Sequence, residues 1–389
     1  MFYIFILIGV MFFLLWTSQL LFVKLHLLWS NKLLSTSKED IDCPVTIIHP
    51  VKDLDYEYEK NVESWINQEY SGDIQHIFSF QDGKDPAIEV IKKMIDKYPQ
   101  KDVEIIVNPV MDGLNGKSSN MVNGIKKAKY EMLLFGDSDT RVKSDFVVKM
   151  IRPLKDRKVG VTTCGQINIG GSNFWTRFFT FVQNSETDFI WAFFTKLGLD
   201  LGMTGAAFGM RKQLIIEVGG LESYGNSLLE DLHLGNKLFK MGYKIVLGPF
   251  VECHVGKLKK EKSINYAKRI ATGVKAHIAI ELPAFVIMLF WYWGLFIWAM
   301  LAADERLIYL SFSYICLRVI YGLMQRVVTL NKIKPIDFTI PLIFDLFGTF
   351  FLVCAFKNQN VTWRGVRYEV KKGGFIEGVD IAADIAEEE

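Results

Sequence analysis

Two aspartates separated by one residue, Asp137 and Asp139, directly follow the apolar run in "LLFGDSDTRV". On a regular strand both side chains would point to one face, where two close carboxylates repel each other unless a cation lies between them. Carboxylate oxygens are hard ligands that favour Mg²⁺ or Mn²⁺, and a sparsely liganded Mg²⁺ completes its shell with phosphates and water. The pair therefore predicts a divalent-metal site; a simple polar turn is the alternative.

Gly116-Lys117-Ser118 stands at an expected junction between a strand and a helix and resembles the end of a phosphate-binding loop. The full pattern needs a glycine five residues before Gly116, and Met111 occupies that position. We therefore do not expect a P-loop nucleoside triphosphatase. Lys117 and the first amides of the helix can still attract a diphosphate, by charge and by the polarity of the helix end.

Glu230 and Asp231 open an expected amphipathic helix. Acids at this position either complement the helix dipole or supply a general base, and the sequence alone leaves both roles open. The basic stretch Ser263 to His277 precedes an apolar segment. It fits a binding site for lipid headgroups or a pyrophosphate, and equally the positively charged flank of a membrane segment.

The elements that must position these residues alternate from Pro44 onward. Short β-branched or aromatic runs separated by helical stretches predict βαβ units and a mainly parallel sheet, the α/β class. Ligands bind beyond the carboxyl ends of the strands in such sheets, where Asp82 and the pair Asp137 and Asp139 fall. The expected strands cover 45–51, 74–82, 103–109 and 132–139, and the expected helices cover 56–69, 86–97 and 118–129.

Apolar segments at both ends of the chain predict an integral membrane protein. Met1 to Val23 is uncharged and long enough to cross a ~30 Å hydrocarbon core, and the cations that follow it predict a cytoplasmic C-terminal side. We expect an anchor over 1–30, a cytosolic domain over 40–277, three transmembrane or re-entrant helices over 279–356, and a polar tail over 357–389. Four crossings would place the basic tail outside, so either the tail departs from the charge rule or the last segment is re-entrant.

Two further features belong to these apolar parts. Short aromatic runs over 177–210, interrupted by charge, predict helices at the membrane interface, with a buried core helix as the alternative. Arg318 and Asp345 lie within apolar segments, where an unpaired charge costs at least ~2.5 kcal/mol. We hypothesise that they pair; the alternative is that Arg318 reaches the membrane surface by itself.

The charge balance and the cysteines exclude other classes. The chain has 45 basic and 43 acidic residues and a net charge of +2, so we expect no nucleic-acid partner. Its five cysteines are scattered and contain no C-x-x-C pair, which favours neither a disulfide framework nor a zinc site.

Taken in order, the segments resemble the GT-A glycosyltransferases of the family 2 type, and most closely the ceramide glucosyltransferase-like branch, family 21. The resemblance covers nearly the whole chain. It is carried by "IHPVKDLDYEYEKNVESWINQEY", "FQDGKDPAIEVIKKMIDKYP", "NGKSSNMVNGIKKAKYEMLLFGDSDTRV", "TGAAFGMRKQLIIEVGGL", "LLEDLHLGNKLFKMGYKI" and "VTWRGVRYEV".

The resemblance implies a GT-A fold and roles for individual residues. Asp82 would contact the nucleotide base, Asp137 and Asp139 would hold the diphosphate through Mg²⁺ or Mn²⁺, and Asp231 would be the catalytic base. The candidate residues for binding the nucleotide sugar are Asp82, Lys117, Asp137, Glu230 and Arg269. One element departs from the family: where its pattern has Q-x-x-R-W, this chain has Tyr266-Ala-Lys-Arg269-Ile270.

The implied reaction follows from these parts. A bound divalent ion stabilises a diphosphate leaving group, and one carboxylate takes the proton of the attacking alcohol. One base and one metal predict a single displacement with inversion. We expect a membrane-bound transferase, facing the cytoplasm, that moves a hexose, with glucose the first choice, from a UDP-sugar to a lipid hydroxyl such as that of ceramide. The alternatives are a related transferase that elongates a glycan and a catalytically silent membrane scaffold.

Overall fold

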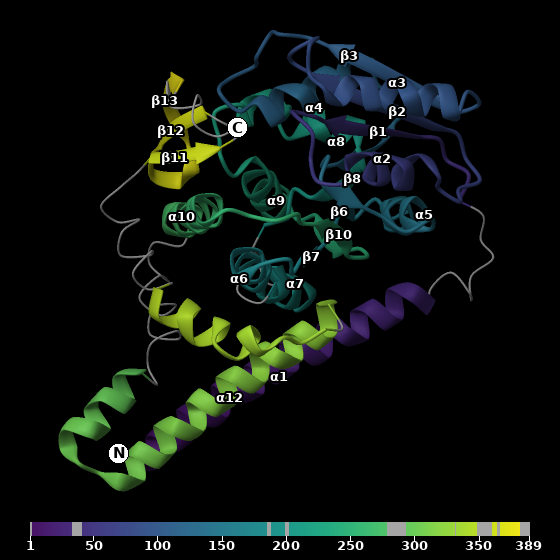
Figure 1. Ribbon diagram of the computed structural model, residues 1–389. Coiled ribbons are helices and arrows are strands. Elements are labelled where there is room, and N and C mark those ends of the chain that lie inside the picture. The colour runs from purple at the N-terminus through teal and green to yellow at the C-terminus, as the bar shows by residue number, and fades with distance from the viewer. Residues whose placement is uncertain are drawn as a thin grey trace.

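A seven-stranded sheet forms the centre of the protein, with the strand order β3-β2-β1-β4-β8-β6-β9 (Figure 1). The structure is a computed structural model that describes residues 2–32, 41–184, 188–198, 202–277, 293–330, 332–347, 360–363 and 366–381. The strands of the central sheet are β1 (Val45–Pro50), β2 (Ile74–Phe80), β3 (Asp102–Val107), β4 (Met132–Gly136), β6 (Val159–Thr163), β8 (Ala207–Arg211) and β9 (Lys244–Leu247).

The sheet is mainly parallel, which confirms the predicted fold class. The pairs β3–β2, β2–β1, β1–β4 and β6–β9 are parallel, and only β8 runs antiparallel to its neighbours β4 and β6. Helices cover both faces because successive strand residues point to opposite sides. One face carries α2 (Tyr58–Ile66), α3 (Ala87–Lys97), α5 (Phe146–Ile151) and η1 (Arg152–Lys155); the other carries α4 (Gly116–Lys127), α8 (Lys212–Glu217), η3 (Leu221–Tyr224) and α9 (Glu230–Lys240).

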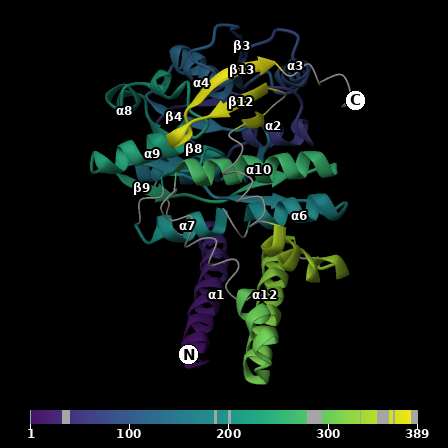
Figure 2. The ribbon, with the colours of Figure 1, turned by 90° about the vertical axis from the view of Figure 1, so that its left-hand side faces the viewer.

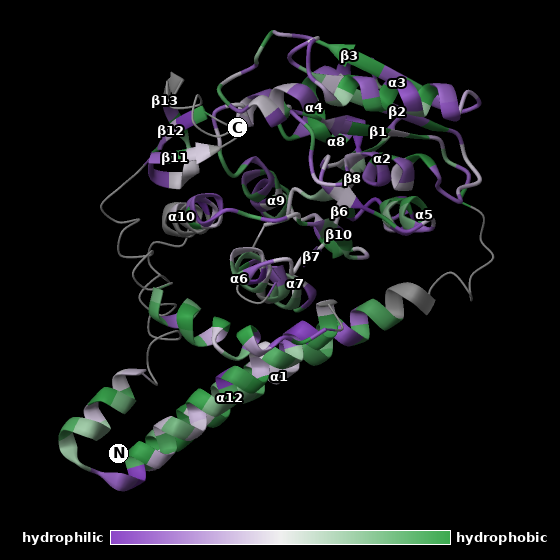
Figure 3. Ribbon diagram, viewed as in Figure 1, coloured by the Kyte–Doolittle hydropathy of each residue, from purple (hydrophilic) through white to green (hydrophobic). Residues whose placement is uncertain are grey.

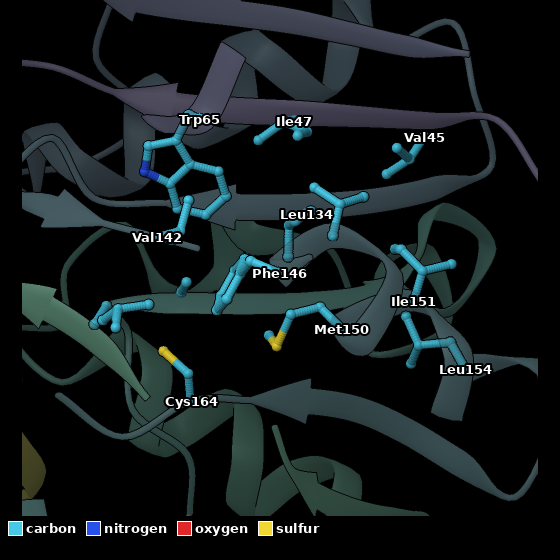
Figure 4. Packing of buried hydrophobic residues seen from close by; sticks show 14 of the residues in the cluster. Val45, Ile47, Trp65, Leu134, Val142, Phe146, Met150, Ile151, Leu154 and Cys164 are labelled. Atoms are coloured by element: carbon cyan, nitrogen blue, oxygen red, sulfur yellow. The ribbon is translucent and has the colours of Figure 1, made fainter. Parts of the chain in front are cut away.

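Neighbouring residues of β1 illustrate the two cores. Ile47 packs with Trp65 of α2 and Phe146 of α5 (Figure 4), whereas Ile48 packs on the opposite face with Met121 of α4. Trp65 also reaches the end of β4, since a Cβ at Gly136 would lie 2.5 Å from the Trp65 ring. This packing fixes the point at which β4 ends and the turn with the two aspartates begins.

A small second sheet and two aromatic helices lie between the central sheet and the apolar helices (Figures 1 and 2). The sheet has the order β5-β10-β7, with β5 (Thr140–Arg141), β7 (Gln166–Ile169) and β10 (Val251–His254), and the helices are α6 (Phe174–Gln183) and α7 (Phe189–Lys196). The expected interfacial range 177–210 was too long. Its last residues form the buried strand β8, whose apolar composition resembles that of a membrane-facing segment.

Two long apolar helices extend away from the α/β body, α1 (Phe2–Lys32) and α12 (Glu305–Leu330) (Figures 1 and 2). Hydrophobic colour predominates on both (Figure 3). They lie side by side, with Trp16 stacked on Tyr321 and the Tyr314 hydroxyl donating a hydrogen bond to the Phe5 carbonyl. Spans Phe2–Leu28 and Glu305–Thr329 have the length and composition to cross a membrane, and most residues of their apolar stretches are not buried.

Between α10 (Lys260–His277) and α12 the described chain contains one short apolar helix, Trp293–Ala302. The rest of the expected segment 279–301 lies outside the described residues. After α12 the chain forms η4 (Pro335–Phe338) and a helix over 340–347. This helix packs against α6 and α12, with the Phe344 ring near Phe181 and Pro341 against Gly322. The remainder of the expected segment 338–356 is again outside the described residues.

The hypothesised pair of buried charges is confirmed. The Arg318 guanidinium donates from Nη2 to Asp345 Oδ1 at 2.8 Å and from Nε to Oδ2 at 2.9 Å. Both side chains are buried, and the guanidinium also lies over the rings of Trp16 and Tyr321. The pair therefore fastens the helix over 340–347 to α12.

The C-terminal residues, expected to be a polar tail, form a three-stranded antiparallel sheet on the α/β body (Figures 1 and 2). Its elements are β11 (Asn360–Trp363), β12 (Val366–Val370), η5 (Lys372–Gly374) and β13 (Ile376–Ile381). Along β12, buried Tyr368 and Val370 alternate with exposed Arg367 and Glu369. The charged face of this alternation gave the segment its polar character in the sequence.

Candidate active site

Four of the predicted site residues come together from three separate segments. Lys117 lies in the first turn of α4, Asp137 follows β4, and Glu230 and Asp231 open α9. The first two segments lie at the edge of the sheet where its parallel strands end, because the loop over 108–115 leads from the outermost strand β3 back to α4, which packs on β1 and β2. The third is brought there by the loop before α9.

Lys117 is the centre of this group. Its Nζ lies 2.7 Å from the Asp137 carboxylate, 3.0 Å from the Gly205 carbonyl oxygen and 3.8 Å from Glu230 Oε1. Burial opposes the charge of Lys117, but Asp137, Glu230 and Asp231 together raise its pKa above the usual value. Lys117 is therefore a permanent cation among three carboxylates.

The two acids of α9 have raised pKa values. The pKa of Glu230 is raised to about 7. Burial is the main cause and the charge of Asp231 adds to it, whereas the charge of Lys117 opposes it. Burial also raises the pKa of Asp231, while Lys117 and the Leu232 amide, which donates to Asp231 Oδ1 at 2.8 Å, lower it. A raised pKa makes the Asp231 carboxylate a stronger proton acceptor than an exposed aspartate.

Asn115 is a site residue that the sequence reasoning missed. Its buried side chain accepts a hydrogen bond from the Ser118 amide, so it caps α4. The Nδ2 group donates to Glu230 Oε2 at 2.9 Å and to the Ser227 carbonyl at 2.7 Å. Asn115 thus ties α4 to the start of α9. An asparagine immediately before "GKSS" is a helix-capping signal that could have identified it.

Gly205 is a second site residue that the sequence reasoning missed. A Cβ at this position would lie 2.8 Å from Asp231 Oδ2 and 3.1 Å from Lys117 Nζ. Only a glycine therefore leaves the space between the acid and the cation open. The nearby Ala206 carbonyl accepts the Asp137 amide at 2.9 Å, so the same loop also supports the aspartate turn.

Asp137 and Asp139 do not lie on a regular strand, contrary to the expectation. β4 ends at Gly136, and both aspartates belong to the turn that leads into β5. The turn is closed by Thr140, whose hydroxyl donates to the Asp137 carbonyl at 2.6 Å and whose carbonyl accepts the Trp65 indole at 3.1 Å. The polar turn after β4 therefore itself supplies Asp137 to the charged group around Lys117.

The donor set of this turn fits a shared divalent ion. Asp137 and Asp139 supply carboxylate oxygens, the ligand class that Mg²⁺ and Mn²⁺ prefer. Within the described part of the chain, no cluster of three or more His, Cys, Asp or Glu side chains suits a metal ion. An ion held by the two aspartates would therefore take its other ligands from phosphate and water.

Asp82 and Arg269 each contact residues outside the Lys117 group. Asp82 is exposed after β2 and accepts the Lys84 amide at 2.9 Å, while its neighbour Gln81 donates to the Gly116 carbonyl beside Lys117. Arg269 lies on α10, with its guanidinium 4.4 Å from the centre of the Tyr266 ring.

Tyr266 explains part of the departure from the Q-x-x-R-W pattern. Its ring packs edge to face on Phe179 of α6, and its hydroxyl accepts a hydrogen bond from Gln183 at 3.0 Å. The tyrosine therefore supports Arg269 by a cation–π contact and joins α10 to α6. The side chain of Ile270 lies outside the described residues.

The C-terminal sheet contacts the start of α9. His233 Nε2 bonds to the Gly373 carbonyl at 2.7 Å, and the His233 ring stacks on Phe375. The Leu228 amide donates to the Gly374 carbonyl, three residues before Asp231. The last described segment of the chain therefore buttresses the helix that carries the two acids.

Comparison with protein families gives a match over most of the chain. The model of Glycosyl transferase family 21 matches residues 7–376. Ceramide glucosyltransferase 3 of Caenorhabditis elegans is 28% identical over 262 residues, which cover 62% of this chain and 52% of that protein. Ceramide glucosyltransferase 1 of the same organism is 25% identical over 240 residues, 61% of this chain and 50% of that protein. The chain thus spans about half the length of these curated relatives.

Two solved structures are similar in part. The mannosyltransferase PcManGT from Pyrobaculum calidifontis, in complex with GDP-Man and Mn²⁺, has a TM-score of 0.46 and 13% identity, covering 89% of this chain and 97% of that one. GalNAc-T7 with UDP, GalNAc and Mn²⁺ has a TM-score of 0.39 and 16% identity, covering 62% and 49%. Both TM-scores lie below 0.5, and nothing about the site follows from them.

Proposed function

The chain belongs to glycosyl transferase family 21, and we propose that it transfers glucose from UDP-glucose to the hydroxyl of a membrane lipid such as ceramide, with inversion. Its relatives in the nematode carry the name ceramide glucosyltransferase, which supports the sugar and the acceptor class. The observation that carries the proposal is the meeting of Lys117, Asp137, Glu230 and Asp231 at one edge of the sheet.

Asp231 is the proposed catalytic base. An alcohol is a weak nucleophile, and removal of its proton by a carboxylate contributes typically 10²–10⁴-fold to such reactions. Burial raises the pKa of Asp231, which makes it a better proton acceptor than an exposed aspartate. Glu230, held by Asn115 and Lys117, keeps the first turn of α9 in place and tunes the charge around Asp231.

The other groups serve the donor. Lys117 and the amides at the start of α4 attract the diphosphate. Asp137 and Asp139 would hold Mg²⁺ or Mn²⁺, which when bound neutralises the charge of the departing diphosphate. Asp82, exposed beside Gln81 and the α4 turn, is the proposed contact for the base, and Arg269 the proposed second cation for the donor.

We propose further that α1 and α12 cross a membrane and that the α/β body lies on the cytoplasmic side. Their outward surface supports this, since Leu7 and Leu14 of α1 and Phe312 of α12 are exposed apolar side chains. A core helix of a soluble protein would be mostly covered. The packing of the C-terminal sheet on the α/β body supports the re-entrant alternative for the segment after α12, with the tail on the same side as the site.

Lipid mass spectrometry of cells that express the full chain tests the proposed activity. We expect a hexosylated lipid that is absent from control cells and from cells expressing Asp137→Ala at equal protein level. A matched variant, Asp156→Ala, changes an exposed aspartate far from the site and should give the same lipid as wild type. The same glycolipid in Asp137→Ala cells would contradict the role of the turn, and a lengthened glycan in place of a single hexose would favour the elongating alternative.

A further inference from the structure

Asp188, the residue immediately before α7, is a buried carboxylate without an assigned role. Its side chain is 5% exposed, and its Oδ2 has no hydrogen-bond partner among the described residues. Burial removes the hydration that stabilises a charge, and it raises the pKa of Asp188 well above the usual value. Buried polar groups in native proteins are nearly always hydrogen-bonded, so an exception of this kind requires an explanation.

The position of Asp188 is between the apolar helices and the aspartate turn. The next residue, Phe189, packs against Phe250 and belongs to the cluster that includes Leu20 and Val23 of α1. On its other side is β10, where Cys253 pairs with Thr140, the residue after Asp139. Asp188 therefore belongs to the layer between α1 and the strand that pairs with the aspartate turn.

The charges of Asp188 and Asp139 both affect the pKa values of two side chains, Cys253 and Tyr266. Burial raises the pKa of Cys253 and of Tyr266, and the charges of Asp139 and Asp188 raise both further, although Arg269 lowers that of Tyr266. The charges of both carboxylates therefore act on β10 and α10.

A buried carboxyl group whose Oδ2 has no hydrogen-bond partner in the described part of the chain favours some ligands over others. A carboxyl group does not attract a diphosphate, and Lys117, the cation proposed to bind the diphosphate, belongs to the group with Asp137 and the acids of α9. A carboxyl group is satisfied by an O–H or N–H donor. The headgroup of an amphiphilic lipid that carries hydroxyl or amide groups provides such donors and has an apolar part that suits α1 and α12.

We propose that Asp188 binds the headgroup of the lipid acceptor, accepting a hydrogen bond from its hydroxyl or amide group and thereby positioning the reacting hydroxyl toward Asp231. The inference rests on the proposed transfer to a lipid and adds the residue that recognises the acceptor. It also explains why an unfavourable buried carboxyl is retained, since the acceptor would supply the missing hydrogen-bond donor.

Steady-state kinetics of the purified full-length protein in detergent test this, with UDP-glucose and short-chain ceramide varied in turn. In Asp188→Asn we expect the KM for ceramide to rise by about tenfold or more, because the amide cannot reproduce the hydrogen bond of the carboxyl group to the headgroup, with the KM for UDP-glucose unchanged. The thermal midpoint should not fall, because asparagine has the same shape and its burial costs no more than that of a carboxyl group. Asp188→Leu should lose the ceramide-dependent rate and keep a UDP-induced thermal shift.

Thr195→Val is the matched control. Thr195 lies on the same helix, and its buried hydroxyl also has no hydrogen-bond partner among the described residues, so its removal should leave both KM values unchanged. An unchanged ceramide KM in Asp188→Asn, or a rise in the UDP-glucose KM instead, would overturn the inference while leaving the transfer activity standing. If wild type transfers no hexose to ceramide or another lipid, the proposed function fails and the inference falls with it.

Discussion

At the scale of single residues, the site depends on charges that oppose each other at short distance. Lys117 neutralises Asp137 and lies close to Glu230, so no carboxylate in the group stands without a cation nearby. The sequence drew attention to these residues because their types and their positions after strands and at helix starts are distinctive. Sequence reasoning missed Asn115 and Gly205 because their contacts are distant in sequence. Asn115 bonds to Glu230, 115 residues later, and Gly205 lies against Asp231, 26 residues later.

Gly205→Ala tests the space between the acid and the cation. The added methyl group would lie 2.8 Å from Asp231 Oδ2, so the carboxylate must move. We expect a loss of transfer activity of about 100-fold, as for other small misplacements of catalytic groups, with little change in the thermal midpoint because the aspartate tip can shift. Gly209→Ala, whose Cβ would meet its neighbours at ordinary contact distance of 3.4 Å, is the control and should stay active. Wild-type activity in Gly205→Ala would contradict the geometry.

The raised pKa of Glu230 predicts that the stability of the fold depends on pH. Its folded-state pKa of about 7 lies above the ordinary value of 4.5 because the side chain is buried. The protonated form is favoured in the fold, so this contribution to stability is complete below the unfolded pKa and is lost as the pH rises through 7. In buffer free of metal and nucleotide, the thermal midpoint of wild type should therefore fall between about pH 5 and about pH 8 relative to that of Glu230→Gln.

Glu222→Gln changes an exposed acid near the same loop and should follow the wild-type pH profile. Parallel profiles for wild type and Glu230→Gln would show that Glu230 does not titrate in this range. That result would contradict the buried environment assigned to Glu230, and it would leave the proposed role of Asp231 unchanged.

At the scale of elements, the predicted strands and helices of the first half of the body agree with the structure to within a few residues. The alternation of hydrophobic runs determines these elements locally, which is why they could be predicted. β8 and the C-terminal sheet could not, because their pairing partners are distant in sequence: β8 inserts between β4 and β6, and β11 to β13 pack at the start of α9.

Contacts between elements near the apolar helices rest on a second set of buried charges. Asp337 of η4 accepts hydrogen bonds from Arg177 of α6, with Nε to Oδ1 at 2.8 Å, and lies 3.4 Å from Arg326 of α12. Burial alone would raise the pKa of Asp337, but the Arg177 and Lys334 hydrogen bonds hold it below its usual value. One carboxylate thus joins three elements.

Asp337→Asn should therefore destabilise the protein strongly. Two buried guanidinium groups lose their shared counter-charge, and breaking such a pair costs about 3–5 kcal/mol. We expect a clear fall in the thermal midpoint measured in detergent. Glu89→Gln, which removes the exposed ion pair with Lys92, should change stability by less than about 1 kcal/mol. Equal midpoints for the two variants would show that the buried cluster does not hold these elements together.

At the scale of the whole molecule, apolar helices, an aromatic layer and an α/β body follow one another along a single axis (Figure 2). The length and composition of α1 and α12 made both helices predictable from the sequence. The path of the chain after α12 was not predictable, because "PLIFDLF" reads like the start of another crossing although it packs along α6 and pairs Asp345 with Arg318.

This arrangement predicts the sidedness of the two chain ends. The start of α1 lies at the end of the helix that is distant from the α/β body, whereas β11 to β13 pack on that body (Figures 1 and 2). In sealed vesicles, a tag at the C-terminus and a protease site in the exposed 82–84 loop should be cleaved from the same side, and a tag at the N-terminus from the opposite side. Protection of the C-terminal tag together with the N-terminal one would refute the re-entrant path.

The most direct measurement of the central claim is glucose transfer from radiolabelled UDP-glucose to ceramide by the purified full-length protein with Mg²⁺ or Mn²⁺. Wild type should form glucosylated ceramide, and Asp231→Asn should lower kcat by about 10²–10⁴-fold while retaining UDP binding, because the variant cannot take the proton of the acceptor hydroxyl. Glu222→Gln should match wild type. Undiminished transfer by Asp231→Asn would contradict the assignment of Asp231 as the base.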